Sequence, residues 1–344
     1  MMEFNVLEQT ENCIDWIRKW FERNGDENSK AIIGISGGID SSTTAALCVE
    51  ALGKDRVIGI MLPNGIQKDI DASQLLIKHL GIKHYTINIG DTYDALLDEM
   101  RVLAENGKEW PGNQYTTNTP ARIRMTALFG AAAMIGNCFV ANTCNISESS
   151  QGYDTVFGDN AGSFAPIAKF TKTEVRKIAK FLELPETLVN KTPVDGMSLN
   201  ADGSYRTDED KLGFTYEELD KTIRNVDYRG PNYAKIVNGF IRTAWKRRIV
   251  NIESYDPELD EYIGREWGWE SEFLKIEFID VKLRNEFDAE VKKIKESKKY
   301  QENFINSVRA VLRLVEDCGS EYVKYSKEEL NQSIWDYLQI YPQE

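Results

Sequence analysis

The stretch Ala31-Ile-Ile-Gly-Ile-Ser-Gly-Gly-Ile-Asp-Ser-Ser42 decides the fold of this 344-residue chain. Its first five residues form a short apolar run that is typical of a buried parallel strand, and residues 43–52 have the pattern of a helix. A strand, a glycine turn and a helix direct backbone N–H groups and a helix N-terminus at an anion. The glycines let the backbone approach a phosphate closely, and hydroxyl donors come from Ser36, Ser41 and Ser42. The sequence therefore predicts a phosphate-binding loop.

Asp40 is the unusual residue of this loop, because a carboxylate repels a bound phosphate. Its presence is explained if Asp40 holds a Mg²⁺ ion that the phosphates share. The spacing is neither that of the P-loop nor that of the dinucleotide fingerprint. Ser-Gly-Gly-x-Asp-Ser resembles the pyrophosphate-binding loop of the N-type ATP pyrophosphatases, which cleave ATP between the α- and β-phosphates and form an adenylated intermediate. The alternative is a plain glycine turn.

Composition excludes several classes of function. A formal net charge of −13 makes nucleic acid a poor partner, and only two histidines argue against a serine–histidine triad or a histidine-rich metal site. No apolar run approaches the length of a membrane span, and residues 1–12 lack the pattern of a signal peptide. The five cysteines have no Cys-x-x-Cys pair, which is typical of reduced thiols. We expect a cytoplasmic protein with no membrane or nucleic-acid partner.

Apolar runs and helical patterns alternate along the first 150 residues. Strands are predicted at residues 30–36, 56–62, 83–89 and 138–143, and helices at 5–24, 41–52, 69–80, 92–105 and 120–135. This alternation predicts an α/β fold with a doubly wound parallel sheet and flanking helices. Ligands of such sheets bind beyond the carboxyl ends of the strands, where the serine–glycine loop lies.

Further along the chain, Thr171-x-x-Glu174 is a capping box that starts a helix through Leu182, and Thr215-x-x-Glu218 starts another. Residues 106–119 and 193–207 contain glycine and proline and are expected to be mobile binding loops. From about residue 252 the chain becomes acidic and aromatic, with apolar residues at helical spacing. We expect a mainly helical C-terminal appendage there.

Two further segments contribute candidate site residues. Val140–Glu148 follows a strand, so Glu148 is a candidate second carboxylate for Mg²⁺ and Thr143 a donor to phosphate or ribose. Alternatively, Asn145 and Ser147 merely cap a helix, and Glu148 is solvated. Lys172 stands at a predicted helix start, where a cation is unfavourable unless an anion binds nearby. Arg122 and Arg124 present a similar anomaly at the start of the helix predicted over 120–135.

Five motifs together make the resemblance specific. The chain resembles NAD synthetase in Gly34-Ile-Ser-Gly-Gly-Ile-Asp-Ser41, Leu62-Pro-Asn-Gly-Ile-Gln67, Asn118-Thr-Pro-Ala-Arg-Ile-Arg-Met125, Thr143-Cys-Asn-Ile-Ser-Glu148 and Thr207-Asp-Glu-Asp-Lys-Leu-Gly-Phe-Thr-Tyr216. Their order and spacing both fit over roughly residues 5 to 250. The resemblance implies an adenine nucleotide alpha hydrolase-like domain at residues 1–251 and leaves residues 252–344 as an extension of unknown role.

The resemblance implies that deamido-NAD is adenylated by ATP and then amidated by ammonia, with release of pyrophosphate and AMP. It implies Asp40, Glu148 and Lys172 as catalytic residues, and Asp40 and Glu148 as the ligands of Mg²⁺. The deamido-NAD contacts would be Arg122, Asp159 and Lys246. The ATP contacts would be Gly34, Ile35, Ser36, Gly37, Gly38, Ile39, Asp40, Ser41, Gln67, Thr143 and Lys172.

Some positions depart from the short, ammonia-dependent enzymes. Those enzymes commonly have lysine, aspartate and histidine where this chain has Val156, Ser163 and Trp245, and these positions contact the dinucleotide in the family. Three alternatives to NAD synthesis therefore stay open: a ligase of the same family acting on another carboxylate, a thiolating pyrophosphatase that uses Cys144, and an ATP-binding subunit without catalysis.

The resemblance also implies a homodimer in which deamido-NAD lies across the subunit interface. The helix predicted over residues 120–135 is apolar nearly all round, so it must be covered on more than one side. One side can pack on the sheet, and a twofold mate is expected to cover the other. The alternative is that the tail or the N-terminal helix covers it within one chain.

Overall fold

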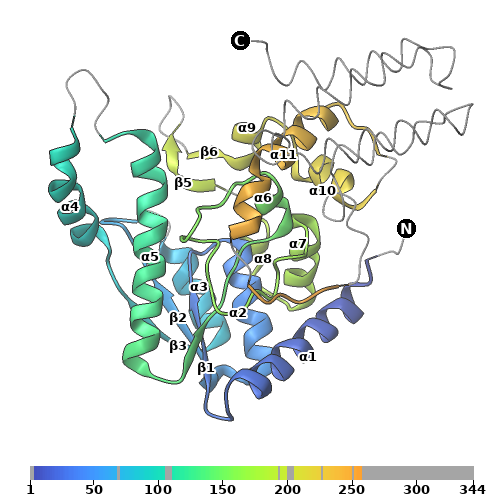
Figure 1. Ribbon diagram of the computed structural model, residues 1–344. Coiled ribbons are helices and arrows are strands. Elements are labelled where there is room, and N and C mark those ends of the chain that lie inside the picture. The colour runs from blue at the N-terminus through green and yellow to red at the C-terminus, as the bar shows by residue number, and fades with distance from the viewer. Residues whose placement is uncertain are drawn as a thin grey trace, which may run out of the picture. The chain divides into compact units, whose positions relative to one another are not determined.

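The sheet at the centre of the fold is parallel. The structure, a computed structural model, describes residues 4–67, 70–104, 111–192, 194–199, 205–225, 228–249 and 252–257. Four strands pair in the order β3-β2-β1-β4 (Figure 1). Their bounds are β1 Lys30–Gly34, β2 Val57–Met61, β3 Lys83–Thr86 and β4 Cys138–Val140. The prediction of a parallel sheet with flanking helices is confirmed.

Helices alternate with the strands as far as β4 and make up most of the elements after it. They are α1 Val6–Asn24, α2 Ile39–Leu52, α3 Ile70–Leu80, α4 Gly90–Glu99, α5 Asn113–Ile135, α6 Ile146–Ser150, α7 Lys172–Phe181, α8 Glu186–Val189, α9 Asp208–Leu212, α10 Tyr216–Arg224 and α11 Tyr233–Ile249. Two short 3₁₀ helices are η1 Lys54–Arg56 and η2 Met100–Leu103. A separate antiparallel pair consists of β5 Val194–Leu199 and β6 Tyr205–Thr207.

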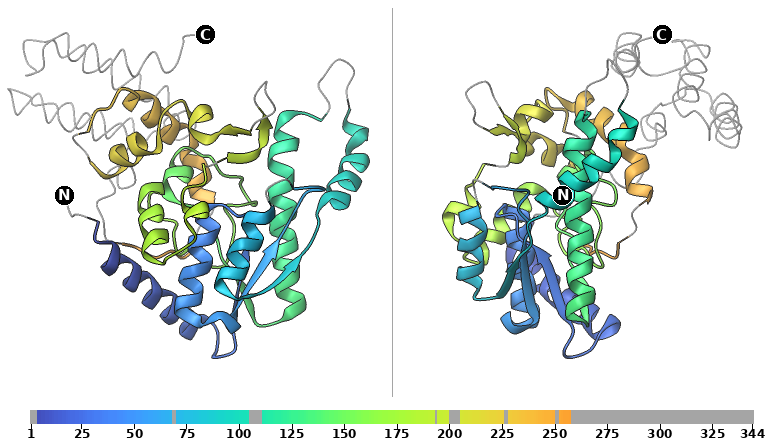
Figure 2. Two further views of the ribbon diagram at one scale, coloured as in Figure 1. Left: turned by 180° about the vertical axis from the view of Figure 1, so that it is seen from behind. Right: turned by 90° about the vertical axis from the view of Figure 1, so that its left-hand side faces the viewer.

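The two faces of the sheet are covered by different helices, as Figure 2 shows from two further sides. Side chains of β1 alternate between the faces, because successive residues of a strand point in opposite directions. Ile33 packs into the core that α1, α2 and α7 complete, whereas Ile32 packs with Met125 and Leu128 of α5. Helix α5 therefore covers this face of the sheet. Within the described part of the chain, the buried helical residues of this second core cluster all belong to α5.

An aromatic cluster joins the beginning and the end of the described chain. The Trp20 ring of α1 stacks on Phe164 at a centroid distance of 4.9 Å and meets Phe139 edge to face at 5.0 Å. The Trp20 Nε1–H donates to Glu253 Oε2 at 3.0 Å, and Tyr255 donates to Gln9 of α1. Residues 252–257 thus pack against α1. The rest of the predicted extension, 258–344, lies outside the described residues, and its helical character stays a prediction.

Helix α5 begins earlier than the sequence indicated. Residues 113–119 were expected to belong to a loop, but they are helical, and Pro120 lies inside the helix. Proline is common in the first turn of helices, so a start at Pro120 was the natural prediction, and it is wrong. As a result Arg122 and Arg124 are not in the first turn of α5, and the helix dipole does not explain them. Residues 105–110 lie outside the described part.

The loop expected over residues 193–207 is also partly wrong, because it contains β5 and β6. Other boundaries agree to within a few residues. Helix α2 starts at Ile39, which puts Asp40 in its first turn. The capping box at Thr171 and the helix start at Thr215 are confirmed. Among the helices described, none is both long and apolar enough to cross a membrane.

The aromatic cluster yields the first prediction. Phe164 is completely buried, so Phe164→Ala removes its contacts with Trp20 and Phe21 and leaves a cavity. We expect a loss of about 3–5 kcal/mol in the free energy of unfolding, measured by urea denaturation. Phe181→Ala is the matched control, because Phe181 is 42% exposed on α7. Equal losses in the two variants would contradict the central role of the cluster.

Candidate active site

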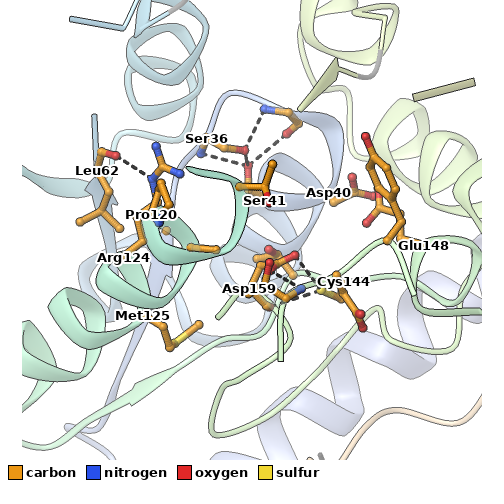
Figure 3. A pocket seen from close by; sticks show the side chains of 18 of the residues that line it. Ser36, Asp40, Ser41, Leu62, Pro120, Arg124, Met125, Cys144, Glu148 and Asp159 are labelled. Carbon is orange, nitrogen blue, oxygen red and sulfur yellow. Dashed lines mark hydrogen bonds between the residues drawn. The ribbon is translucent and has the colours of Figure 1, made fainter. Parts of the chain in front are cut away.

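A cavity of about 900 Å³ opens beyond the carboxyl ends of the central strands. Its wall combines the glycine turn, the segment after β2, the first half of α5 and the polar segment after β4. Figure 3 shows Ser36 and Ser41 on one side of this cavity, Asp40 beside Glu148 on another, and Arg124 opposite them. The edge of the sheet predicted to bind ligands is therefore hollow and polar.

The glycine turn is held in a fixed shape. Gly37 has φ +74°, a conformation that disfavours side chains, and an added Cβ would lie 2.8 Å from Ala72 Cβ and 2.9 Å from the Ser73 nitrogen. The Ser73 hydroxyl donates to the Ile35 carbonyl at 3.1 Å, which joins the turn to α3. The turn is therefore pressed against α3, and only glycine fits at position 37.

The serines of the turn stabilise it from inside. The Ser41 hydroxyl donates to the Gly38 carbonyl at 3.1 Å, and the Ser36 and Ser41 hydroxyls lie 3.0 Å apart. Gly38 is the N-cap of α2 and has no side chain to cap it. The N-terminus of α2 therefore faces the cavity as a site suited to an anion.

Three charged groups meet at one point beside this turn. The Lys172 ammonium lies 2.5 Å from Asp40 Oδ2 and 2.7 Å from Glu148 Oε1. The Lys172 side chain is 3% exposed, and the two carboxylates are 16% and 15% exposed. Burial lowers the pKa of the Lys172 ammonium, but the two carboxylates raise it above its ordinary value overall. Burial raises the pKa of Glu148, against the effect of Lys172. The cluster is an internal triad of one ammonium and two carboxyl groups, and it carries one excess negative charge only when both carboxyls are ionised.

Asn145 joins the Asp40 carboxylate to the backbone of Glu148. Its Oδ1 accepts from the Glu148 backbone N–H at 3.0 Å, so it caps α6, which was one part of the alternative interpretation; the other part, a solvated Glu148, is wrong because Glu148 pairs with Lys172. Its Nδ2 also donates to Asp40 Oδ1 at 2.9 Å. One completely buried amide therefore sets the position of Glu148 relative to Asp40. The sequence alone indicated only the cap.

The other predicted site residues divide into two groups. Gln67, Thr143, Asp159 and Lys246 line the cavity. Arg122 does not line it: the side chain is exposed, and its Nε–H donates to the Val156 carbonyl at 3.1 Å. Every predicted ATP contact from Gly34 to Ser41 lines the cavity except Gly37. Ser42, the third predicted hydroxyl donor, does not line it and donates to the Gly38 carbonyl instead.

Asp159 and Lys246 are tied to neighbouring segments. Asp159 Oδ1 accepts from the Thr155 N–H at 2.8 Å, and burial raises the pKa of this carboxyl. The Lys246 ammonium donates to the carbonyls of Gly152 and Asp154, both at 2.6 Å. Cys144 donates from its thiol to the Asp159 carbonyl, and burial raises its thiol pKa well above the ordinary value. Cys144 is therefore a poor nucleophile in this state.

Two wall residues had no role assigned from the sequence. Arg124 donates from Nε to the Leu62 carbonyl at 2.9 Å, and burial lowers the pKa of its guanidinium. Asp208 is 5% exposed and accepts from the hydroxyls of Tyr153 at 3.0 Å and Tyr216 at 3.3 Å. The motif at 207–216 was the sequence signal that could have singled out Asp208. Its position in the cavity wall, however, depends on the tertiary fold.

Of the positions that depart from the short enzymes, Ser163 contacts the central sheet. The Ser163 hydroxyl accepts from the Val140 N–H at 3.2 Å at the end of the sheet, and Val156 is 9% exposed. The Trp245 side chain lies outside the described part. Neither Ser163 nor Val156 is among the residues of the cavity wall.

Comparison with known proteins agrees with this architecture. The family model described as NAD synthase matches residues 9–252. The NH(3)-dependent NAD(+) synthetase of Pyrococcus furiosus is 36% identical over 206 residues, which are 59% of this chain and 75% of that protein. The corresponding protein of Methanococcus aeolicus is 38% identical over 210 residues, 59% of this chain and 77% of its own length.

Solved structures are similar over most of the chain. The NMN synthetase from Francisella tularensis has a TM-score of 0.63 at 28% identity and covers 74% of this chain and all of its own. The NH3-dependent NAD synthetase from Campylobacter jejuni has a TM-score of 0.57 at 27% identity, with 72% and 99% covered. The match over residues 9–252, the glycine turn and the ion triad lead to one conclusion: this chain belongs to the NAD synthase family.

Proposed function

We propose that the protein is an ammonia-dependent NAD synthetase, which converts deamido-NAD, ATP and ammonia into NAD, AMP and pyrophosphate. The observation that carries the proposal is the buried lysine between two carboxylates, directly beside an anion-binding turn in one cavity. The names of the relatives at 36% and 38% identity support the choice of substrates.

In the first step a carboxylate oxygen of deamido-NAD attacks the α-phosphorus of ATP, and the bond to the β-phosphate oxygen breaks. Pyrophosphate leaves and an acyl adenylate remains. Activation is needed because a free carboxylate is a poor electrophile. In the second step the lone pair of ammonia attacks the acyl carbon, AMP leaves with the bonding electrons, and a proton is lost to give the amide. Positioning and neutralisation of charge supply most of the catalysis.

The residues of the cavity suit the first step. The turn from Ser36 to Ser41 and the N-terminus of α2 are suited to the β- and γ-phosphates. Lys172 begins α7, and its ammonium would exchange a carboxylate partner for a phosphate oxygen as charge develops on pyrophosphate. Gln67 and Thr143 lie in the same wall and would contact the adenosine part.

Asp40 and Glu148 are suited to hold Mg²⁺ with the phosphates. Both carboxylates contact the same ammonium, so their oxygens face one point, and oxygen is the ligand that Mg²⁺ prefers. In the described part of the chain no group of three or more histidine, cysteine, aspartate or glutamate side chains can hold a metal ion, so phosphate oxygens would complete the coordination. The ion supplies charge neutralisation on the leaving pyrophosphate.

Amidation of nicotinate mononucleotide is a second candidate. The similarity to the NMN synthetase from Francisella tularensis favours it, since that structure has a TM-score of 0.63. Val156 and Ser163 also stand where the short NAD synthetases have charged residues that contact the dinucleotide. In this chain the Ser163 hydroxyl instead accepts a hydrogen bond from the Val140 N–H of β4. Both candidates use the same ATP half of the site. They differ in the second substrate, because deamido-NAD has an adenylate moiety that nicotinate mononucleotide lacks.

Release of AMP from ATP tests the proposal. With ammonium present, we expect kcat/KM for deamido-NAD to exceed that for nicotinate mononucleotide by at least about tenfold, because a second nucleotide adds binding energy. The AMP and pyrophosphate formed should equal the amide formed. A preference for the mononucleotide would move the assignment to the second candidate, and no turnover of either would refute the function.

The metal role of Asp40 gives a further prediction. Asp40→Asn keeps the shape but removes a charge, so Mn²⁺ binding in the presence of a non-hydrolysable ATP analogue should weaken, as measured by electron paramagnetic resonance. Turnover should fall at least about 100-fold, since charge stabilisation by the metal is worth several kcal/mol. Asp71→Asn is the control, because Asp71 is an exposed acid in the first turn of α3. Normal Mn²⁺ binding by Asp40→Asn would remove Asp40 from the metal site.

The exposed face of α5 supports the proposal of a homodimer. Phe129 is 42% exposed and Met134 is 91% exposed, while Met125 and Leu128 of the same helix are buried. An added Cβ at Gly130 would meet no atom, so a second helix can approach closely there. The exposed Arg122 lies on the same helix, outside the cavity of its own chain. A twofold mate on this face would bring Arg122 to the interface.

The oligomeric state in solution tests whether this face of α5 is a dimer interface. We expect the protein to be a dimer at roughly 10 µM in light scattering, and Phe129→Glu to be a monomer because a charge replaces an apolar contact. Leu7→Glu is the matched control: Leu7 is 47% exposed on α1, away from α5, so that variant should stay dimeric. A monomeric parent protein with full activity would refute the dimer.

A further inference from the structure

We propose that Asp220 of α10 is a positioning residue, which fixes the backbone of Lys172 relative to Glu148 and so sets the geometry of the ion triad. The proposal rests on the proposed function, because it assigns Lys172 and Glu148 to the reaction. Asp220 lies on α10, which packs on both α6 and α7, and it is not among the residues that line the cavity.

The Asp220 carboxylate uses its two oxygens on two different helices. Oδ1 accepts from the Ser147 hydroxyl at 2.5 Å, and Oδ2 accepts from the backbone N–H of Thr173 at 2.8 Å. Ser147 lies on α6 next to Glu148, and Thr173 lies on α7 next to Lys172. One side chain therefore bonds to the immediate neighbours of both residues.

A third hydrogen bond closes the connection. The backbone N–H of Lys172 donates to the Ser147 hydroxyl oxygen at 2.9 Å. The Ser147 hydroxyl thus accepts from α7 while it donates to α10, and Asp220 is the acceptor that fixes this direction. Ser147 is completely buried and Asp220 is 4% exposed, so water does not replace these partners.

These bonds complete the cap of α7. The first N–H groups of a helix have no partner within it. Here those of Lys172, Thr173 and Glu174 are accepted by Ser147, Asp220 and Thr171 respectively. A negative charge at this end of the helix is also favoured by the helix dipole. Burial raises the pKa of Asp220 to about 6, and its hydrogen bonds oppose that rise.

Lys172 and Glu148 are thus connected both at their charged ends and through their backbones. The Lys172 ammonium is 2.7 Å from Glu148, and the backbones that carry the two side chains are joined through Ser147. If α7 shifts relative to α6, the ammonium moves away from the carboxylates. Geometry of this kind must hold to a fraction of an ångström for efficient charge stabilisation.

The experiment compares Asp220→Ala, Asp220→Asn and Thr215→Ala. Asparagine keeps one acceptor oxygen, so it should rescue part of the function. Thr215→Ala is the matched structural control, because it removes the N-cap of the same helix α10 without touching Ser147 or Thr173. Each variant is measured for its melting temperature, for kcat and KM in AMP formation, and for binding of Mg·ATP by calorimetry.

We expect kcat of Asp220→Ala to fall at least about tenfold per folded molecule, with Asp220→Asn between it and the parent protein. Thr215→Ala should melt at a lower temperature and keep its kcat. Unchanged kcat and Mg·ATP binding in Asp220→Ala would overturn the proposal and leave a purely structural cap.

If Asp220→Ala does not fold, Ser147→Ala decides, because it cuts the link between α6 and α7 and leaves the bond from Thr173 to Asp220 intact. An unchanged kcat in that variant overturns the proposal. Failure of the proposed function is distinguishable: the parent protein would then form no AMP with either carboxylate. Binding of Mg·ATP would still report on the triad, and equal binding by Asp220→Ala and the parent would overturn the positioning role.

Discussion

The contact between the Lys172 ammonium and the carboxylates of Asp40 and Glu148 is the interaction on which the rest of the site depends. Three charged groups have left bulk water, and their mutual attraction compensates for that loss only at short distance. Removing the lysine would leave two buried carboxylates facing each other. The requirement is met because α2, α6 and α7 all begin at one point, where hydrogen bonds from Asn145 to Asp40 and from Lys172 to Ser147 hold their first turns.

The part of the fold that follows from local signals was predictable from the sequence. The strands predicted from the sequence agree with the four parallel strands to within a few residues. The central strands β1 and β2 are apolar, as expected for buried strands of a parallel sheet, whereas the edge strand β3 is exposed along its length. The glycine turn located the cavity, and the capping box at Thr171 located the start of α7 and with it Lys172. Asp159 and Lys246, which the resemblance implied as substrate contacts, also lie in the cavity wall. Their contacts with substrate stay predictions.

The remainder depends on tertiary contacts that no local pattern contains. Pro120 suggested a helix start, yet α5 begins at Asn113, and of the two arginines that follow Pro120 only Arg124 is in the cavity wall. Asn145 read as a helix cap, and its second hydrogen bond to Asp40 spans 105 positions. Asp220 lies in the helix predicted to start at Thr215, and no motif of the sequence marks it. Its bond to Ser147 spans 73 positions, and only the folded chain brings the two together.

The contacts of residues 252–257 with α1 have a consequence for biosynthesis. Trp20 bonds to Glu253 across 233 positions, and Gln9 bonds to Tyr255 across 246. The first helix to leave the ribosome therefore waits for its final partners until almost 260 residues have been made. By then α2 and α7, which pack with the apolar face of α1, have long been made, so what is missing is the hydrogen-bond partners of Trp20 and Gln9. Closing so long a loop slows the last stage of folding, and the speed of translation therefore bears on how soon α1 acquires these final contacts.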